Sequence, residues 1–90
     1  MNLNHRRSSI QIIADMLHTG ENGAGKTKIM YNSNLSYTQI QKYMTFLLTH
    51  GFIAEIHVGN PKITYQITDS GSKLLRSIES VTEMLGWLDE

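Results

Sequence analysis

The polar residues of the segment 36–50 are of the types that read DNA bases. If this segment is a helix, one face carries neutral donors and acceptors together with one cation: Ser36, Tyr37, Thr38, Gln41, Lys42 and Thr45. A Gln amide can bond adenine through two atoms, a Thr methyl can contact thymine, and a Lys ammonium can reach guanine or phosphate. No acid occurs from Ser36 to Gly51, and an acid there would be repelled by phosphate. An ordinary solvated helix face is usually richer in Glu and Lys, so this face predicts contact with double-stranded DNA.

Two further pairs of residues have the chemistry to contact a phosphate backbone. Lys26 and Lys28 open the segment 26–32, and the first N–H groups of a helix there would add to the attraction for an anion. Asn60 and Lys62 lie at the tip of a predicted hairpin. From that tip they would either reach an adjacent groove or simply keep the hairpin end soluble.

Residues 20–27 read GENGAGKT and match the phosphate-loop pattern G-x-x-x-x-G-K-[ST]. That loop requires a buried strand before it, a long helix after it and a parallel sheet. Here an amphipathic helix precedes it, and the helix that follows has about two turns. We therefore expect no nucleotide site, and expect the glycines to turn the chain between two helices.

The sequence contains no recognisable catalytic or metal-binding set. The four histidines, His5, His18, His50 and His57, lie far apart, and no pair has the i, i+4 spacing of metal ligands on a helix. No nucleophile has a base and an orienting partner at a motif distance. The chain has no cysteine, which excludes disulfides and thiolate metal sites. We expect no metal, no cofactor and no enzymatic activity.

The elements that would position the polar residues follow from hydrophobic periodicity. It predicts helices over about 7–18, 26–32, 36–50 and 68–88, and strands over 52–58 and 63–67. Ser36 and Gln39 have the capping-box spacing, and Gly51 is placed to end the third helix. The predicted fold class is mainly α with a small β-hairpin: a winged helix-turn-helix plus a long C-terminal coiled-coil helix.

Apolar residues on these elements define the expected core. In the first helix the expected inner face is Ile10, Ile13, Ala14 and Leu17, widened by Ile12 and Met16. In the third helix the stripe is Ile40, Tyr43, Met44, Leu47 and Leu48. In the hairpin, one face of the first strand is Phe52, Ala54, Ile56 and Val58, and one face of the second is Ile63, Tyr65 and Ile67. We expect both strand faces to pack against the helices.

The last helix carries apolar residues with the alternating spacing of a heptad seam: Leu74, Ile78, Val81, Leu85 and Leu88. About twenty residues form a rod of roughly 30 Å, longer than a small domain can cover. The seam packs either on its own domain or on the same helix of a second copy. An apolar stripe that extends past the domain favours a homodimer through these five residues.

The formal net charge of the 90-residue chain is zero, but the charges are unevenly distributed. Residues 1–62 hold six cations and three anions, whereas residues 63–90 hold two cations and five anions. The predicted DNA-reading part is therefore the basic part, and the acidic part should point away from phosphate. No apolar run approaches the roughly 18 residues of a membrane span, and the start lacks the apolar core of a signal peptide. We expect a cytoplasmic, nucleoid-associated protein.

Several blocks of the sequence occur together in the order of a known family. They are Lys26-Thr27-Lys28-Ile29-Met30-Tyr31, Asn34-Leu35-Ser36-Tyr37, Tyr43, Leu47, Gly51 and Tyr65-Gln66-Ile67-Thr68-Asp69-Ser70-Gly71. On these residues the chain resembles the archaeal ten-kilodalton winged-helix DNA-binding proteins that dimerise through a C-terminal coiled coil. The resemblance covers about residues 6–88 and implies a winged helix, an antiparallel coiled-coil dimer and DNA binding. The departure is charge, because a neutral chain is less basic than an abundant nucleoid coating protein should be, and this favours a regulator.

The resulting hypothesis is a homodimeric double-stranded DNA-binding protein, a transcriptional regulator that reads the major groove with helix 36–50. Residues 6–67 would form the DNA-binding domain, and residues 68–90 the dimerisation helix. The alternatives are a nucleoid-architectural protein that bridges DNA, and a winged helix that binds another protein and no DNA. No membrane and no small-molecule substrate is expected as a partner.

Overall fold

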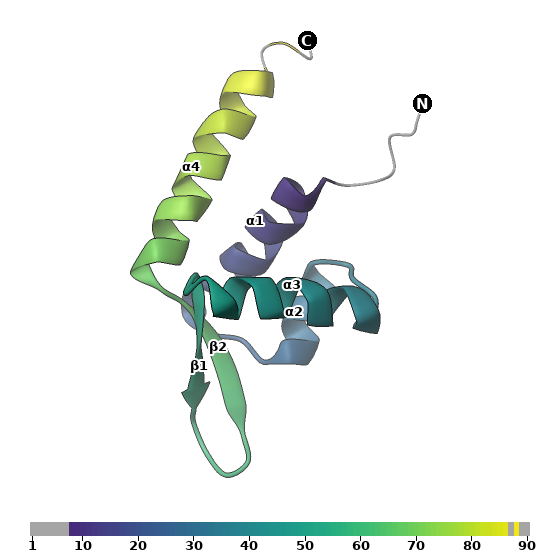
Figure 1. The fold of residues 1–90 in the computed structure, drawn as a ribbon, viewed down its shortest axis with the longest axis vertical. Coiled ribbons are helices and arrows are strands. Elements are labelled where there is room, and N and C mark those ends of the chain that lie inside the picture. The colour runs from purple at the N-terminus through teal and green to yellow at the C-terminus, as the bar shows by residue number, and fades with distance from the viewer. Residues whose placement is uncertain (1–7, 87, 89–90) are drawn as a thin grey trace.

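The computed structural model describes residues 8–86 and 88. The elements within this range are α1 (Ser9–Thr19), the short 3-10 helix η2 (Gly20–Asn22), α2 (Lys26–Asn32), α3 (Tyr37–Thr49), β1 (Ile53–His57), β2 (Ile63–Ile67) and α4 (Asp69–Gly86). This order confirms the predicted fold class, a mainly helical chain with one antiparallel hairpin between the third helix and a long last helix (Figure 1). No helix in this part of the chain is long and apolar enough to cross a membrane.

Two helices begin at the same kind of capping box. The hydroxyl of Ser36 accepts from the Gln39 N–H at 3.2 Å, and the Gln39 side chain accepts from the Ser36 N–H at 3.0 Å. This confirms the box predicted for α3. An equivalent box joins Ser8 and Gln11 and starts α1. The predicted start at Arg7 lies outside the described residues.

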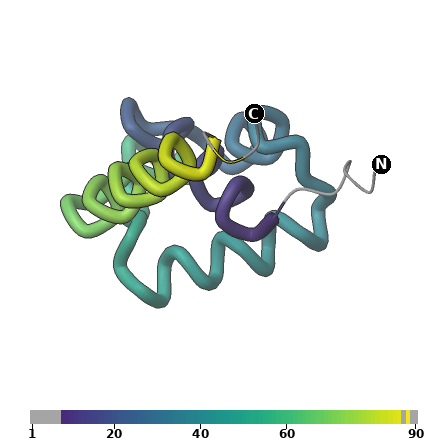
Figure 2. Tube along the Cα trace, turned by 90° about the horizontal axis from the view of Figure 1, so that it is seen from above, coloured from purple at the N-terminus to yellow at the C-terminus, as the bar shows by residue number. Residues whose placement is uncertain are grey.

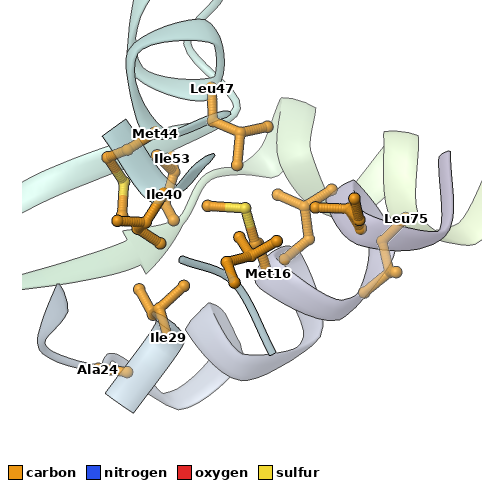
Figure 3. Packing of buried hydrophobic residues seen from close by; sticks show 11 residues of the cluster. Met16, Ala24, Ile29, Ile40, Met44, Leu47, Ile53 and Leu75 are labelled. Carbon is orange, nitrogen blue, oxygen red and sulfur yellow. The ribbon is translucent and has the colours of Figure 1, made fainter. Parts of the chain in front are cut away.

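The core lies where the three short helices meet the base of the hairpin and the first half of α4. Figure 3 shows 11 buried side chains of this cluster. They are Ile12, Met16, Leu17, Ala24, Ile29, Leu35, Ile40, Met44, Leu47, Ile53 and Leu75. The stripe predicted for α3 is confirmed, with Ile40, Met44 and Leu47 buried, and Tyr43 and Leu48 packed at its edge.

The inner face predicted for the first helix is partly wrong. Ile10 is 55% exposed, whereas Leu17 is buried as predicted, and Ile12 and Met16, which were predicted to widen the apolar face, are 6% and 0% exposed. Seen from above, α1 lies between α2 and α3 with α4 beside it (Figure 2). Because neighbours cover α1 on more than one side, periodicity alone could not select which of its many apolar residues face the core.

The predicted face of the first hairpin strand is also partly wrong. In the observed register Ile53 pairs with Ile67, and Glu55 pairs with Tyr65. Directly paired residues of an antiparallel ladder share a face, so Ile53 joins the apolar side of β2. Ile53 is 2% exposed.

Of the residues predicted on the packed face of the first strand, Ala54 and Ile56 lie on the other face of the hairpin, whereas Phe52, just before β1, packs against the core. Ile56 is 42% and Val58 is 54% exposed. Tyr65 and Ile67 of the second strand pack against the core as predicted. A slip of one residue exchanges the two faces of a strand, and the turn and the core contact of Ile53 together set the register here.

One residue of the loop between α1 and α2 forms an isolated antiparallel bridge to the hairpin. The N–H of Ala24 donates to the Tyr65 carbonyl at 3.0 Å, and the Tyr65 N–H donates to the Ala24 carbonyl at 2.8 Å. This bridge fastens the base of β2 beside the start of α2. The sequence predicted a loop here and gave no sign of the pairing.

The long last helix is anchored to the body by its first turns. The Thr68 hydroxyl accepts from the Gly71 N–H and donates to the Gly51 carbonyl, which starts α4 beside the end of α3. A Cβ on Gly71 would lie 2.0 Å from the Phe52 carbonyl oxygen, so only glycine permits this approach. Leu75 then enters the core at 3% exposure.

Beyond these turns α4 extends away from the body. It ends at Gly86, slightly short of the predicted end near Leu88. Figure 1 shows its far end and the hairpin at opposite ends of the long axis, along which the molecule measures 49 Å. The second half of the helix therefore carries its apolar side chains outside the core.

Candidate nucleic-acid interface

The outer face of α3 lies open to solvent. The side chains predicted to contact DNA from this helix are all exposed: Ser36, Tyr37, Thr38, Gln41, Lys42 and Thr45. The opposite side of the same helix holds Ile40, Met44 and Leu47 in the core. Burial of that side fixes which polar residues face outward, and no described segment of the chain covers them.

Three of the predicted contact residues form one hydrogen-bonded group between α2 and α3. The Lys26 ammonium donates to Oε1 of Gln41 at 2.5 Å. Nε2 of Gln41 donates to the Tyr37 hydroxyl at 3.3 Å. The same ammonium lies 5.5 Å from the centre of the Tyr37 ring, within range of a cation–π attraction. The first turn of α2 is thus tied to the first two turns of α3 on the exposed surface.

Lys42 lies on the other flank of α3, although it follows Gln41 in sequence. Its ammonium is 5.7 Å from the centre of the Tyr43 ring. The two residues line a shallow hollow of about 250 Å³ together with Ser9, Ile13 and Phe46. Successive residues of a helix are about 100° apart, so Gln41 and Lys42 bracket the outer face and Thr38 and Thr45 lie between them.

The exposed side of α2 carries one further candidate DNA-contact residue, which the sequence analysis did not select. Tyr31 is 76% exposed and stands three positions after the exposed Lys28. Residues three apart on a helix are neighbours. That spacing was a signal that could have marked Tyr31 as a candidate beside Lys28.

The tip of the hairpin holds the other two predicted contact residues. Asn60 and Lys62 are both exposed, and the Val58 N–H closes the loop on the Lys62 carbonyl at 3.1 Å. They are separate from the Lys26 group, at the far end of the hairpin. Nearer the base of the hairpin, burial raises the pKa of the Tyr65 hydroxyl, and the nearby Glu55 carboxylate raises it further. This hydroxyl is therefore neutral at physiological pH.

Comparisons with known proteins identify the family of this fold. The winged helix-turn-helix family profile matches residues 6–86. The chain belongs to this family. Sso10a-2, a DNA-binding protein from Sulfolobus solfataricus, has a crystal structure that superposes with a TM-score of 0.83 at 28% identity, over 91% of this chain and 85% of that one.

Two uncharacterized proteins of Methanocaldococcus jannaschii are also similar to the chain. One is 33% identical over 85 residues, which span 93% of this chain and 82% of the relative. The other is 33% identical over 81 residues, which span 89% of this chain but 36% of the relative. The matched segment therefore makes up most of the first relative and about a third of the second.

Within this winged helix, residues 20–27 do not have the surroundings of a phosphate loop. They follow α1, form η2 and the Ala24 bridge, and lead into an α2 of 7 residues. The strand pairing in the described part of the chain is antiparallel. The glycines turn the chain between two helices, as the sequence predicted.

Three acidic side chains of the winged helix lie together between α1 and α4. Glu79 and Glu83 of α4 face Asp15 of α1 across a hollow of about 430 Å³. Gln11 and Ala14 of α1 and Ile78 and Thr82 of α4 complete the lining of this hollow. Across residues 8–86 and 88, no cluster of three or more His, Asp or Glu side chains has the geometry to hold a metal.

Proposed function

We propose that this protein binds double-stranded DNA as a homodimer and acts as a transcriptional regulator. The observation that carries the proposal is the exposed face of α3, which has no acid from Ser36 to Gly51 and lies beside the cations of α2. A face of neutral donors and acceptors with flanking cations suits a groove lined by base edges and phosphates.

In this proposal α3 enters the major groove, as the second helix of a helix-turn-helix does. Gln41, Thr38 and Thr45 meet base edges, and Lys42 meets a base or a phosphate on the other flank. Lys26 and Lys28 contact the backbone beside α2, with Ser36 and Tyr37 near the same strand. Asn60 and Lys62 of the hairpin reach the adjacent groove or backbone. The similarity to the DNA-binding protein Sso10a-2 supports this assignment.

The dimer in this proposal forms through α4, with residues 68–90 as the dimerisation helix and residues 6–67 as the DNA-binding domain. Val81, Leu85 and Leu88 are 48%, 51% and 79% exposed, and an apolar stripe of this kind is costly to leave in water. Leu74 and Ile78 are half-buried beside the body, so they would join the interface at its edge. An antiparallel coiled coil would place one head at each end of the rod.

The regulatory role rests on charge. A formal net charge of zero provides little of the non-specific attraction that a DNA-coating protein depends on. A binding selection on random duplexes tests this part of the proposal. We expect an enriched motif, whereas uniform recovery would favour an architectural protein that bridges DNA.

DNA binding itself is tested by fluorescence anisotropy on duplex DNA with the double variant Gln41→Ala, Lys42→Ala. Each lost base contact is worth about 1–3 kcal/mol, so affinity should fall at least tenfold, while circular dichroism and the unfolding midpoint stay close to wild type. Lys73→Ala, which removes an exposed cation from α4, is the matched control and should bind nearly as well as wild type. Equal affinity of the double variant and wild type would remove α3 as the reader.

Salt dependence separates DNA binding from the protein-binding alternative. If two to four phosphates are neutralised in the complex, affinity should fall about ten- to a hundredfold between 50 and 200 mM salt. An apolar protein contact should change little over that range. Absence of duplex binding at low salt would leave the protein-binding alternative. The proposal assigns no catalytic step and no cofactor.

A further inference from the structure

Gln41 is held by a hydrogen bond on each side of its amide. Oε1 accepts from the Lys26 ammonium at 2.5 Å, and Nε2 donates to the Tyr37 hydroxyl at 3.3 Å. The partners come from different elements, α2 and the first turn of α3. An exposed Gln is ordinarily free to rotate about its last torsion, and here that torsion is restrained.

The chemistry of Lys26 decides which way the amide faces. An ammonium has donors and no acceptor, so the amide atom nearest to it must be the carbonyl oxygen. The NH₂ group is then turned toward the Tyr37 hydroxyl, whose oxygen can accept. Reversing the amide would place two donors against each other. Lys26 therefore sets the order in which Gln41 presents its acceptor and donor to solvent.

Each of these two atoms keeps one unused bonding position. Oε1 has a second lone pair, and Nε2 has a second hydrogen. Together they offer one acceptor and one donor side by side on the exposed face of α3. The major-groove edge of adenine offers the complement, a donor at N6 and an acceptor at N7, and a Gln amide can pair with both.

We propose that Gln41 is a specificity-determining residue for an adenine in the major groove, and that Lys26 is a positioning residue that holds the Gln41 amide in the required order. This inference rests on the proposed DNA binding and adds the base that the site selects. The ammonium of Lys26 has three N–H donors, so the bond to Gln41 leaves two for a phosphate. Tyr37 supports the other side of the amide.

The test uses duplexes found by binding selection with the full-length wild-type protein. Each adenine of the enriched site is replaced in turn by guanine, cytosine and thymine, and affinity is measured by anisotropy. For one adenine we expect a preference of about five- to 150-fold, the range of a good bidentate contact. Gln41→Ala should abolish that preference and leave the preferences at other positions in place.

Lys26→Met and Lys28→Met form a matched pair, because each removes one cation from α2. Both should reduce the slope of log affinity against log salt by about 1 if each cation contacts a phosphate. Lys26→Met should also lower the adenine preference, whereas Lys28→Met should not. Lys26→Arg keeps a donor and a positive charge and should restore most of the preference.

A readout without DNA follows the amide directly. In ¹⁵N NMR spectra, the chemical shifts of the Gln41 side-chain NH₂ group should change in Lys26→Met, and ¹⁵N relaxation should show that this group is more mobile. Neither quantity should change in Lys28→Met.

The outcomes separate the inference from the proposed function. If wild type binds no duplex, the proposed function fails and the inference fails with it. If wild type binds duplexes but shows no adenine preference, or if Gln41→Ala leaves that preference in place, the inference alone fails. If Lys26→Met and Lys28→Met have the same effect on the preference, Lys26 does not position the amide.

Discussion

Two amphipathic helices of this chain, α3 and α4, differ in what covers their apolar sides. The stripe of α3 is enclosed by the chain's own core, with Ile40, Met44 and Leu47 at 0%, 3% and 0% exposure. The stripe on the second half of α4 lies outside that core, with Val81 and Leu85 about half exposed. The two stripes have similar apolar spacing in the sequence. Hydrophobic periodicity shows that one face of a helix is apolar, but it does not show which part of the protein covers that face.

The difference divides the proposed tasks between the two helices. Enclosure of its inner side holds α3 rigidly and presents one polar face for recognition. The second half of α4 has no such cover within one chain, which suits assembly with a second copy. Variants that change apolar side chains of one helix and leave the other helix intact test this division.

The largest expected effect is on assembly. The double variant Val81→Asp, Leu85→Asp should convert the proposed dimer to monomers, because a buried and unpaired carboxylate costs several kcal/mol. Light scattering coupled to gel filtration measures the mass. Ser80→Asp adds a carboxylate at another exposed position of the same helix and should leave the dimer intact. A dimer that survives the double substitution would mean that the stripe of α4 is not the interface.

Removal of apolar volume from α3 should act on stability instead. Ile40→Ala should lower the free energy of unfolding by about 2–5 kcal/mol, since it deletes a fully buried side chain from the core. Chemical denaturation followed by circular dichroism measures the change. Val81→Ala on α4 is the comparison, and at low protein concentration it should cost much less. Similar losses for the two variants would contradict the contrast between the helices.

The two halves of α4 can be compared through its glycines. Gly71→Ala would place a Cβ against the Phe52 carbonyl oxygen, whereas a Cβ on Gly86 meets nothing within 4 Å. Gly71→Ala should therefore destabilise the fold by about 1–3 kcal/mol. Gly86→Ala should be neutral or slightly stabilising, because alanine favours the helix. Thermal unfolding of both variants checks the pair, and the reverse order would mean that α4 is not anchored through Gly71.

The smallest expected effect is at the start of α3. Ser36→Ala removes the capping hydroxyl that accepts from the Gln39 N–H and should cost about 1 kcal/mol. The first turn carries Tyr37 and precedes Gln41, so fraying there should also weaken duplex binding. Ser36→Asp keeps an acceptor at the cap and should retain most of the stability, measured by urea unfolding. Its carboxylate would face phosphate, so its DNA affinity should fall below that of wild type.

Most of the fold was predictable because its signals are local. The bounds of α2 match the predicted 26–32, and the cap at Ser36 and the end at Gly51 follow from short-range chemistry. The inner face of α1 was not predictable from periodicity, because Ile10 and Ile12 are equally apolar and contacts with other elements decide between them. The hairpin register was missed for a related reason: both faces of β1 carry apolar residues, and the core contact of Ile53 selects one.

The candidate site was predictable as a set of residues and not as an arrangement. The sequence placed Lys26 and Gln41 in separate helices and assigned each to DNA on its own. Their hydrogen bond spans 15 positions along the chain, and no local pattern signals a contact of that separation. The division of Gln41 and Lys42 onto two flanks of α3 follows from helix geometry, but which flank faces α2 does not.

The amino-acid sequence by itself determined the order of the elements, the caps, the acid-free face of α3 and the apolar stripe of α4. These depend on residue type and spacing, which act over a few positions. Tertiary structure alone decided the register of the hairpin, the close approach of Gly71 to Phe52, and the bond that turns the Gln41 amide. Each of these requires two segments that are distant in the chain to meet in space, and packing of the whole core brings them together.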